Sequence, residues 1–516
     1  MTNNLIKDNI QLDSTKLTRD GADGYSSALF ELHLQLHSQV ANPYTFNPKQ
    51  NYNSYSTLKE SYNYDGVYGP IPDENGFVDL TDYASLYIPD YQNIITIPEE
   101  NQKYLNSGIL PTSMESSFFN CFNLQSIDLS KINFKNCISF ENMFNKDDKD
   151  ETMAITEILG ISNWDTSSLE NINNFILAPN IKLLDLSLWN TNNLKYVSDS
   201  AITINRDSGI VDISNWNLNN LIFDSMKDDG WISICCHKLI AKNCNISKLT
   251  DLSYLFSGIV FLTTILDVSN WKTSNIVKMH HTFGFRTYEI GLRGDLSEII
   301  GLETWDISNV EDLEGCFHGN SQFNSDISTW NVTNVTDFSG MFSNSSLSQE
   351  SANKLINWDM ANATDVSSMF SYLRLTNFDF IKNWNLSNVQ DISSFFSRNY
   401  VIENITVSKV FPINSKSKIT NIRNLFEGCN KLTRIDISNW DTSKINNFTQ
   451  LFDGTTSLIN IIGNKIIDMG SATSCISMFD ETSITGIHLK NVPRSLDLSK
   501  IGGTENTTYI IDNYIG

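Results

Sequence analysis

The chain has 516 residues and a formal net charge of −23 at pH 7, from 59 acidic and 36 basic side chains. A surface this acidic repels phosphate backbones and anionic membranes, which argues against nucleic-acid binding. Hydrophobic residues make up 40% of the chain, too many for a disordered protein, and no stretch approaches the roughly 18 consecutive apolar residues of a membrane span.

Residues 1–100 show no repeat, and we interpret them as an attachment or capping region. They begin without an apolar run of signal-peptide length. The strict alternation in Leu32–His37 predicts a strand. The following segment is rich in tyrosine, whose apolar ring and polar tip suit a contact surface as well as a loop-rich cap. The tyrosines expected to make attachment contacts are Tyr44, Tyr52, Tyr55, Tyr62, Tyr64 and Tyr68.

Residues 101–500 repeat a pattern with a period of about 25 to 28 residues, typical of a stacked array. One slot of the pattern holds Trp164, Trp189, Trp216, Trp271, Trp305, Trp330, Trp358, Trp384 and Trp440, or else Ile132, Cys244 and Ile467. Twelve positions later, nine copies have Phe144, Phe256, Phe283, Phe317, Phe342, Phe370, Phe396, Phe452 and Phe479. The copies at Trp164, Trp189 and Trp216 lack this phenylalanine, so we expect an altered structure there.

The stretch Ile435–Phe452 contains one copy of the pattern in clear form. Its first residues alternate apolar and polar, which predicts a half-buried strand. Ile445, Phe448, Leu451 and Phe452 then follow the spacing of one face of a short helix. Thr442 and Ser443 precede this face, where a hydroxyl can cap the helix.

We call one copy of this repeat a coil. One coil cannot bury its own aromatic rings, so it needs a neighbour on each side. A stacked ring hides on the order of 150–250 Å², which at about 25 cal/mol/Å² contributes roughly 4–6 kcal/mol before entropy. We therefore predict an α/β fold: a right-handed solenoid of about 13 turns over residues 101–500, with a parallel sheet on one face and short helices on the other. Residues 1–100 and 501–516 are placed to cap it.

The motifs Ile161–Ser167 and Ile437–Ser443, with the Met-Phe pairs Met341-Phe342 and Met369-Phe370, resemble the repeats of BspA-like bacterial surface proteins. The resemblance covers roughly residues 105–500. It implies a variety of leucine-rich repeat, extracellular adhesion or recognition, and no catalysis.

One aspartate recurs between apolar residues near the end of the predicted strand, where it should point away from the core. Stacked in neighbouring coils, these carboxylates would form a partial column that binds cations or a basic partner. The alternative is a solvated stripe that keeps the sheet soluble. The residues are Asp128, Asp185, Asp212, Asp267, Asp326, Asp436 and Asp497.

Histidine and cysteine give no recognisable metal spacing, so we predict no metal and no cofactor. His33 and His37 share one strand face, and His280 and His281 follow Met279, without Cys, Asp or Glu at ligand spacing. We interpret the eight cysteines as small buried thiols; adjacent Cys235 and Cys236 leave open a vicinal disulfide. No nucleophile or phosphate-loop motif is present, although paired carboxylates of glycosidase type would be revealed only by distance.

These patterns favour a non-enzymatic recognition, adhesion and structural protein that presents an elongated surface. We expect it in a bacteriophage particle, as a fibre, tail or capsid accessory protein attached to other subunits through residues 1–100. The alternative is a cell-surface or secreted adhesin that binds host protein or glycan. The expected location is therefore the virion or the extracellular surface, without nucleic acid or membrane insertion, and a homo-oligomer stays open.

Overall fold

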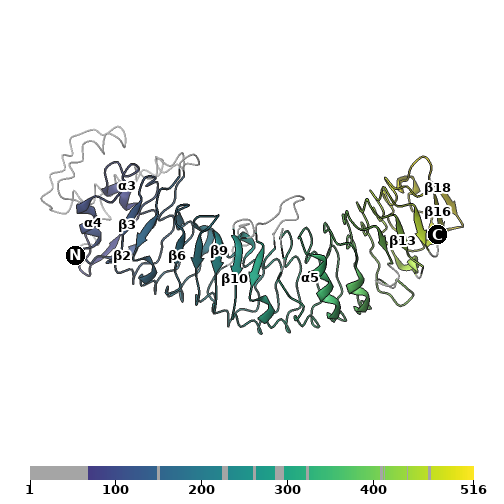
Figure 1. Ribbon diagram of the computed structural model, residues 1–516, viewed down its shortest axis with the longest axis horizontal. Coiled ribbons are helices and arrows are strands. Elements are labelled where there is room, and N and C mark those ends of the chain that lie inside the picture. Colours follow the sequence, from purple (N-terminus) through teal and green to yellow (C-terminus); the bar gives the residue numbers. More distant parts are fainter. Residues whose placement is uncertain are drawn as a thin grey trace, which may run out of the picture.

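The computed structural model describes residues 68–147, 152–222, 230–259, 263–284, 296–320, 323, 325–406, 411, 413–438, 440–462 and 466–516. In Figure 1 these residues form an elongated, curved array, and sequence order follows the long axis from the purple end to the yellow end. Coils that are neighbours in sequence are therefore neighbours in space. Tyr44, Tyr52, Tyr55, Tyr62, Tyr64, His33, His37 and the predicted strand Leu32–His37 lie outside the described residues.

The regular elements are short, and strands outnumber helices. The described strands are β1 (Phe77–Asp79), β2 (Leu110–Ser113), β3 (Ser126–Asp128), β4 (Glu157–Leu159), β5 (Ile176–Leu177), β6 (Leu183–Asp185), β7 (Val197–Thr203), β8 (Ile210–Asp212), β9 (Ile232–Ile240), β10 (Thr263–Asp267), β11 (Glu298–Ile300), β12 (Asn404–Ile405), β13 (Arg434–Asp436), β14 (Asn460–Ile462), β15 (Ile466–Asp468), β16 (Gly486–Lys490), β17 (Val492–Pro493), β18 (Thr508–Ile511) and β19 (Tyr514–Ile515). The described α-helices are α3 (Tyr83–Tyr87), α4 (Glu99–Leu105) and α5 (Gln349–Asn353), and the 3-10 helices are η2 (Ile161–Asn163), η3 (Ser257–Ile259), η4 (Leu302–Thr304), η5 (Lys354–Asn357), η6 (Asp379–Asn383), η7 (Thr442–Lys444) and η8 (Leu498–Lys500).

The strands of neighbouring coils pair in parallel, which confirms the pairing predicted from the sequence. In the stretch analysed above, Ile435 of β13 lies opposite Ile405 of β12 and Ile461 of β14. Ile435 is fully buried, whereas Arg434 is exposed and Asp436 is half-buried. The period of two thus sends the central residue inward and its neighbours outward.

A second row of parallel bridges lies seven positions after the tryptophan slot. Asp337 follows Trp330 at this distance, and Asp365 follows Trp358. The row runs from Asp251 through Lys278, Asp312, Asp337, Asp365, Asp391, Asn421 and Asn447 to Ser474. In the described coils between β11 and β12 this row continues where strand pairing is absent, and elsewhere it gives neighbouring coils a second junction on their perimeter.

The predicted helix over Ile445–Phe452 is wrong, because these residues form consecutive turns. The amides of Phe448, Gln450 and Phe452 donate to carbonyl oxygens of the next coil at 2.9, 2.8 and 3.0 Å. The intervening Leu451 amide closes a turn onto the Phe448 carbonyl at 3.2 Å. An α-helix would direct all these amides within its own segment, so bonding between coils replaces it.

The turns depend on left-handed backbone at every fourth residue. Gln450 has φ of 53° and Gly454 has φ of 69°. The same pair of positions recurs as Asn424 and Gly428, and as Ser368 and Tyr372. Glycine takes this conformation without steric cost and asparagine more readily than most residues. Other side chains held there are stabilised by the bonds to both neighbouring coils.

Two of the three coils without the phenylalanine use strand pairing instead of turns at this place. Ile176 and Ala201 occupy the phenylalanine position; the first lies in β5 and the second in β7. β5 pairs with β7, and β7 pairs with β9. Asp228, in the third coil, lies outside the described residues. The altered structure expected from the missing phenylalanine is confirmed as a local sheet.

The phenylalanines stack along the core as the sequence predicts. The Phe317 ring lies 5.7 Å from Phe283 and 5.8 Å from Phe342, with interplanar angles of 4° and 11°. Phe426 continues the stack with centroid distances of 5.4 Å to Phe396 and 5.6 Å to Phe452. Offset-stacked rings add to the energy of area burial, so the stack rewards regular spacing between coils.

The tryptophans form a second aromatic column, and six of the nine in the slot bond to the preceding coil. Trp358 and Trp384 stack at 6.2 Å. Buried Trp330 donates its Nε1–H to the Leu302 carbonyl at 2.9 Å. Trp189, Trp216, Trp271, Trp305 and Trp384 make the equivalent bond. Each of these six tryptophans therefore contributes both apolar area and a hydrogen bond to its neighbour, whereas Nε1 of Trp164, Trp358 and Trp440 has no hydrogen-bond partner among the described residues.

Asparagine supplies a third link between coils. The Asn334 side-chain amide donates to the Ser308 carbonyl of the preceding coil at 2.7 Å. The same bond, between 2.5 and 3.0 Å, is made by Asn193, Asn220, Asn275, Asn309, Asn362 and Asn388. An amide can satisfy a carbonyl that the turn leaves unpaired, so this position favours asparagine.

Pairing between coils begins before the expected boundary at residue 100. Phe77 of β1 lies opposite Leu110 of β2, and the Ala84 amide donates to the Ser117 carbonyl at 2.7 Å. Asp82 has φ of 56° and Ser116 has φ of 53°, so the turn conformation matches as well. The segment from Phe77 onward lacks the tryptophan slot, so the repeat pattern in the sequence does not reveal that this segment belongs to the array.

Replacing Trp330 by alanine should destabilise the protein by about 3–5 kcal/mol, because it removes a buried ring and a hydrogen bond. Coupling in a stacked array is between neighbours. Hydrogen exchange should therefore show lost protection mainly in the coils of Trp305 and Trp358. The control is Leu188→Ala, since Leu188 is 68% exposed. Equal loss of protection along the whole described chain would contradict the stacked arrangement.

Candidate functional site

Five of the seven aspartates predicted to bind a ligand end strands β3, β6, β8, β10 and β13, and all seven cap the turn that follows them. Asp185 Oδ1 accepts hydrogen bonds from the Ser187 amide at 3.0 Å and the Ser187 hydroxyl at 2.7 Å. The other six, Asp128, Asp212, Asp267, Asp326, Asp436 and Asp497, each accept the amide of the serine two positions later. The recurring Asp-x-Ser is therefore a turn motif.

This capping affects the acidity of three of the carboxyls. Hydrogen bonds from the serine two positions later lower the pKa of Asp128, Asp326 and Asp497, and the bond from the hydroxyl contributes more than the bond from the amide. A nearby lysine adds to the effect in each case. These carboxylates are therefore ionised at neutral pH.

The structure brings only two of the seven into direct register. Asp185 lies opposite Asp212 in neighbouring strands. Asp128 lies opposite Leu159, and Asp436 lies opposite Ile462, because adjacent coils carry apolar residues at that place. Asp267 is 2% exposed and pairs with Lys242 at 3.1 Å. Ligand binding by this set stays a prediction.

A second set of aspartates, which sequence reasoning missed, does lie in continuous register. Asp312, Asp337, Asp365 and Asp391 are joined by parallel bridges in consecutive coils. We call these four residues the aspartate row. All are half-buried, and each accepts an amide two positions later at 2.7 to 2.9 Å. Parallel neighbours are spaced at about 4.8 Å, so four carboxylates follow one line on the surface.

The crowding of the aspartate row appears in the pKa values. Burial raises the pKa of Asp365, and the negative charges of Asp337 and Asp391 raise it further. Burial likewise raises the pKa of Asp312, with an added contribution from Asp337. Amide hydrogen bonds to both carboxyls oppose these effects. The row thus concentrates negative charge that would gain from a positively charged ligand.

A signal for this row is present in the sequence. Aspartate lies seven positions after Trp305, Trp330, Trp358 and Trp384. The row is not predicted from the sequence, because these residues fall in the stretch whose spacing predicts a helix, where neighbouring coils are not expected to pair. Correct assignment of the turn as a second ladder would have found the row.

Two histidines and a carboxylate gather at one end of the aspartate row. His280 Nδ1 lies 3.2 Å from Glu314 Oε2 and 4.0 Å from Asp312 Oδ2. The other ring nitrogen, Nε2, lies 3.0 Å from the Tyr254 hydroxyl. One ring nitrogen of buried His281 lies within 4.8 Å of one donor atom of His280 and one of Glu314. The sequence did not suggest this cluster, because Glu314 comes from the next coil and not from the coil of His280 and His281.

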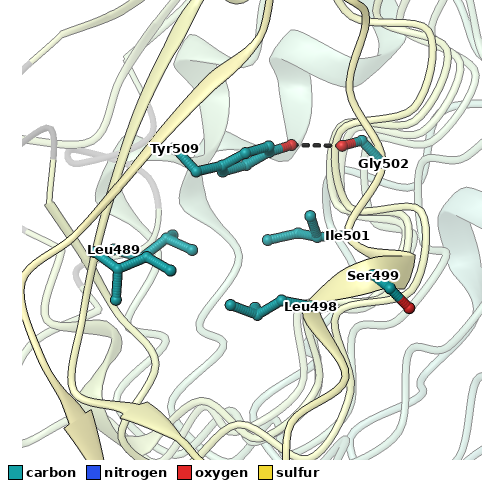
Figure 2. A pocket seen from close by; sticks show the side chains of 7 residues that line it. Leu489, Leu498, Ser499, Ile501, Gly502 and Tyr509 are labelled. Atoms are coloured by element: carbon teal, nitrogen blue, oxygen red, sulfur yellow. Dashed lines mark hydrogen bonds between the residues drawn. The ribbon is translucent and has the colours of Figure 1, made fainter.

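An apolar pocket lies near the yellow end of the array, between β16, β18 and η8 (Figure 2). The Tyr509 hydroxyl donates to the Gly502 carbonyl across one side of it. Burial raises the pKa of Tyr509 to about 12. The lining residues are Leu489, Leu498, Ser499, Ile501, Gly502, Tyr509 and Ile511. This lining suits an apolar group and offers no carboxylate or imidazole.

The remaining predicted sites concern tyrosine and cysteine. Tyr68, the one attachment tyrosine that the structure describes, accepts the Tyr83 hydroxyl on its carbonyl oxygen at 2.6 Å. All eight cysteines are buried thiols, as we interpreted them, so Cys235 and Cys236 form no disulfide. Burial raises the pKa of Cys236 to about 12, which keeps this thiol protonated and unreactive.

A family model described as "Mycoplasma protein of unknown function, DUF285" matches residues 112–229, 234–290, 292–409 and 413–491. The chain belongs to this family. All four matches lie within residues 101–500, where the sequence predicts the repeat. The family match therefore confirms that a repeated unit makes up this part of the chain. Among curated proteins, none matches the chain.

Two solved structures match this chain distantly. The "Crystal structure of TLR13-ssRNA13 complex" covers 78% of this chain and 73% of its own, with 11% identity and a TM-score of 0.16. The "Crystal structure of mouse RP105/MD-1 complex" covers 81% and 70%, with 12% identity and a TM-score of 0.12. At these TM-scores the likeness carries no argument. Among the described residues, no helix has the length and apolar character needed to cross a bilayer.

Replacing Asp365 by asparagine should raise the melting temperature at pH 7. The raised pKa means that the native carboxyl holds its proton more tightly than the unfolded one, so Asp365 weakens the fold as pH rises above the ordinary value of 3.8. Asparagine keeps an acceptor for the Ser367 amide and removes the charge. The gain should therefore shrink as pH falls toward and below 3.8.

Thermal melts of the native protein and the variant between pH 3.5 and 7 measure this difference. Asp359→Asn is the matched control, because exposed Asp359 also caps a turn, through the Ala361 amide at 3.1 Å, but lies outside the aspartate row. A gain at pH 7 no larger than that of the control would show that crowding in the row costs nothing.

Proposed function

We propose that the protein is a non-enzymatic recognition protein that binds a basic protein segment along the outer surface of its coils. The aspartate row is the observation that carries this proposal. It presents one charged group per coil at a spacing of about 4.8 Å, which flexible side chains can follow on an extended partner with lysine or arginine at every second residue. Such a strand repeats each side chain of one face at roughly 6.8 Å, so its long basic side chains can reach successive carboxylates.

The overall charge supports the same kind of partner. A net charge of −23 attracts basic proteins over a distance and repels acidic ones. Complementary charge acts mainly on the rate and specificity of association. The half-buried carboxylates of the aspartate row are less screened by salt than fully exposed ones. We therefore expect them to contribute to affinity as well as to the association rate.

The chemistry of the other polar groups supports a function without catalysis. The carboxylates predicted as ligands serve as turn caps, and the thiol of Cys236 is held protonated by burial. The pocket in Figure 2 is lined mainly by aliphatic groups and one tyrosine. Each of these groups has a role in the fold, and adhesion needs only the surface that they support.

For the setting, we propose a bacteriophage particle, in which an elongated array would be displayed outside after assembly. The resemblance to BspA-like surface repeats supports a cell-surface or secreted adhesin as the alternative. Both settings place the same coil surface before a partner, and they differ in what holds the protein. In the particle, other subunits would contact residues 1–100.

The binding proposal is tested by two quadruple variants with equal changes in charge. The first replaces Asp312, Asp337, Asp365 and Asp391 by asparagine. The second replaces Asp128, Asp185, Asp212 and Asp436. Both keep an acceptor for each turn. The probe is a synthetic peptide that alternates lysine and threonine, and binding is measured by calorimetry from 50 to 300 mM salt.

The first variant should lose at least ten-fold in affinity and most of the salt dependence, while the second stays within about three-fold of the native protein. If the second variant loses more than the first, the partner binds at the set of aspartates predicted from the sequence. Equal small losses would show that neither set recognises a basic segment. Circular dichroism of both variants checks that the fold is retained.

The setting is tested by mass spectrometry of purified particles and of the cell envelope from one producing culture. The particle proposal predicts the protein at constant stoichiometry with capsid proteins through a density gradient. Recovery in the envelope fraction alone would support the adhesin.

A further inference from the structure

We propose that His280, His281 and Glu314 form a zinc-binding site that clamps neighbouring coils together. Two imidazoles and one carboxylate are a donor set that zinc prefers, with an open position for water or a further ligand. One donor atom from each residue lies within 4.8 Å of the others. The site adjoins the aspartate row and shares only Asp312 with it, so neither proposal depends on the other.

The distances come close to those of a coordinated ion. Zinc bonds to nitrogen and oxygen at about 2.0–2.1 Å, so tetrahedral ligands lie about 3.3 Å apart. His280 Nδ1 and Glu314 Oε2 are already 3.2 Å apart. The His281 donor atom lies within 4.8 Å of the other two, so metal binding has to shorten this spacing by up to about 1.5 Å. Asp312 Oδ2, 4.0 Å from His280 Nδ1, is placed to be a fourth ligand.

Tyr254 positions the His280 ring for this role. Its hydroxyl lies 3.0 Å from Nε2, so Nε2–H donates to the tyrosine oxygen when Nδ1 binds the metal. The Tyr254 ring also stacks on His281, at 5.8 Å with an interplanar angle of 3°. Groups that fix the unligated nitrogen orient the imidazole and raise affinity. Tyr254 is thus a positioning residue that contacts both histidines.

The backbone around the cluster leaves room for the rings only because glycine is present. Gly315 has φ of 56°, and a Cβ atom there would lie 2.4 Å from His281 Cε1. A Cβ atom on Gly284 would lie 2.0 Å from the Gly315 carbonyl oxygen. These two glycines let the turn that carries His281 approach the turn that carries Glu314, and so bring donors from neighbouring coils together.

The chemistry selects zinc over the common hard cations. Ca²⁺ and Mg²⁺ bind six or more oxygen ligands, whereas two of the three donors here are imidazole nitrogens. Coordination pairs the Glu314 carboxylate with a cation and joins the coil of His280 and His281 to the next one. We therefore expect zinc to raise the stability of these coils.

The test uses full-length protein without an affinity tag, freed of metal by a chelator. Equilibrium dialysis with Zn²⁺ should show one ion bound per chain, and Co²⁺ should give the visible absorption of a four-coordinate complex. Glu314→Gln and His280→Gln should weaken binding at least 100-fold. Tyr254→Phe should weaken it by about 10- to 100-fold while it keeps the stacked ring.

His488→Gln is the matched control, because His488 pairs with the Asp512 carboxylate but has no second histidine among its described partners. Its zinc affinity should equal that of the native protein. Glu314→Gln and Tyr254→Phe change few atoms, so the test holds even if a histidine variant misfolds. The proposal is overturned if native protein binds less than half an equivalent of Zn²⁺ at 10 μM free ion, or if Glu314→Gln binds as tightly as the control.

Discussion

Hydrogen bonding from each coil to its neighbours is the constraint on which the rest of this structure depends. Apart from α3, α4, α5 and the short 3-10 helices, the described coils have no helix of their own to satisfy the backbone, so their strands and turns direct amides to adjacent coils. Trp330 and Asn334 add side-chain bonds to the preceding coil. A coil must therefore keep nearly constant length and shape, and this requirement explains why aromatic and polar residues recur at fixed positions.

The sequence was sufficient to predict the aromatic stacks and the parallel pairing of strands such as β13 and β14, because burial alone imposes those patterns. It also predicted strands in the coils of Trp330, Trp358 and Trp384, where the described residues form none. Phe317 and Phe342 stack as their spacing predicts. The helix was wrong because apolar residues at i, i+3, i+6 and i+7 fit consecutive turns as well as a helix. What distinguishes the two is left-handed backbone at positions such as Gln450 and Gly454, and this depends on partners in other coils. Likewise Asp337 gains significance only when its neighbours in the row are known.

The surface features follow from the same constraint. When coils stack in register, any residue type favoured at one position is multiplied into a line. Asparagine forms such a line as a structural link, and aspartate forms the aspartate row at the cost of a raised pKa for Asp312 and Asp365. Where one coil departs from the repeat, as at His280 and His281, unusual side chains meet across coils. Function can thus reside in a line of repeated side chains such as the aspartate row, in a local cluster such as His280, His281 and Glu314, or in both.

The most direct test of this account is to delete one complete coil and compare it with the loss of half a coil. Removing residues 338–365 joins Asp337 to Val366 and leaves every remaining coil a neighbour in register. Urea unfolding followed by circular dichroism should then show a folded protein with a cooperative transition close to that of the native chain. Removing residues 338–351 breaks the register and should abolish the transition in the adjoining coils. Equal behaviour of the two deletions would contradict the coil as the unit of this fold.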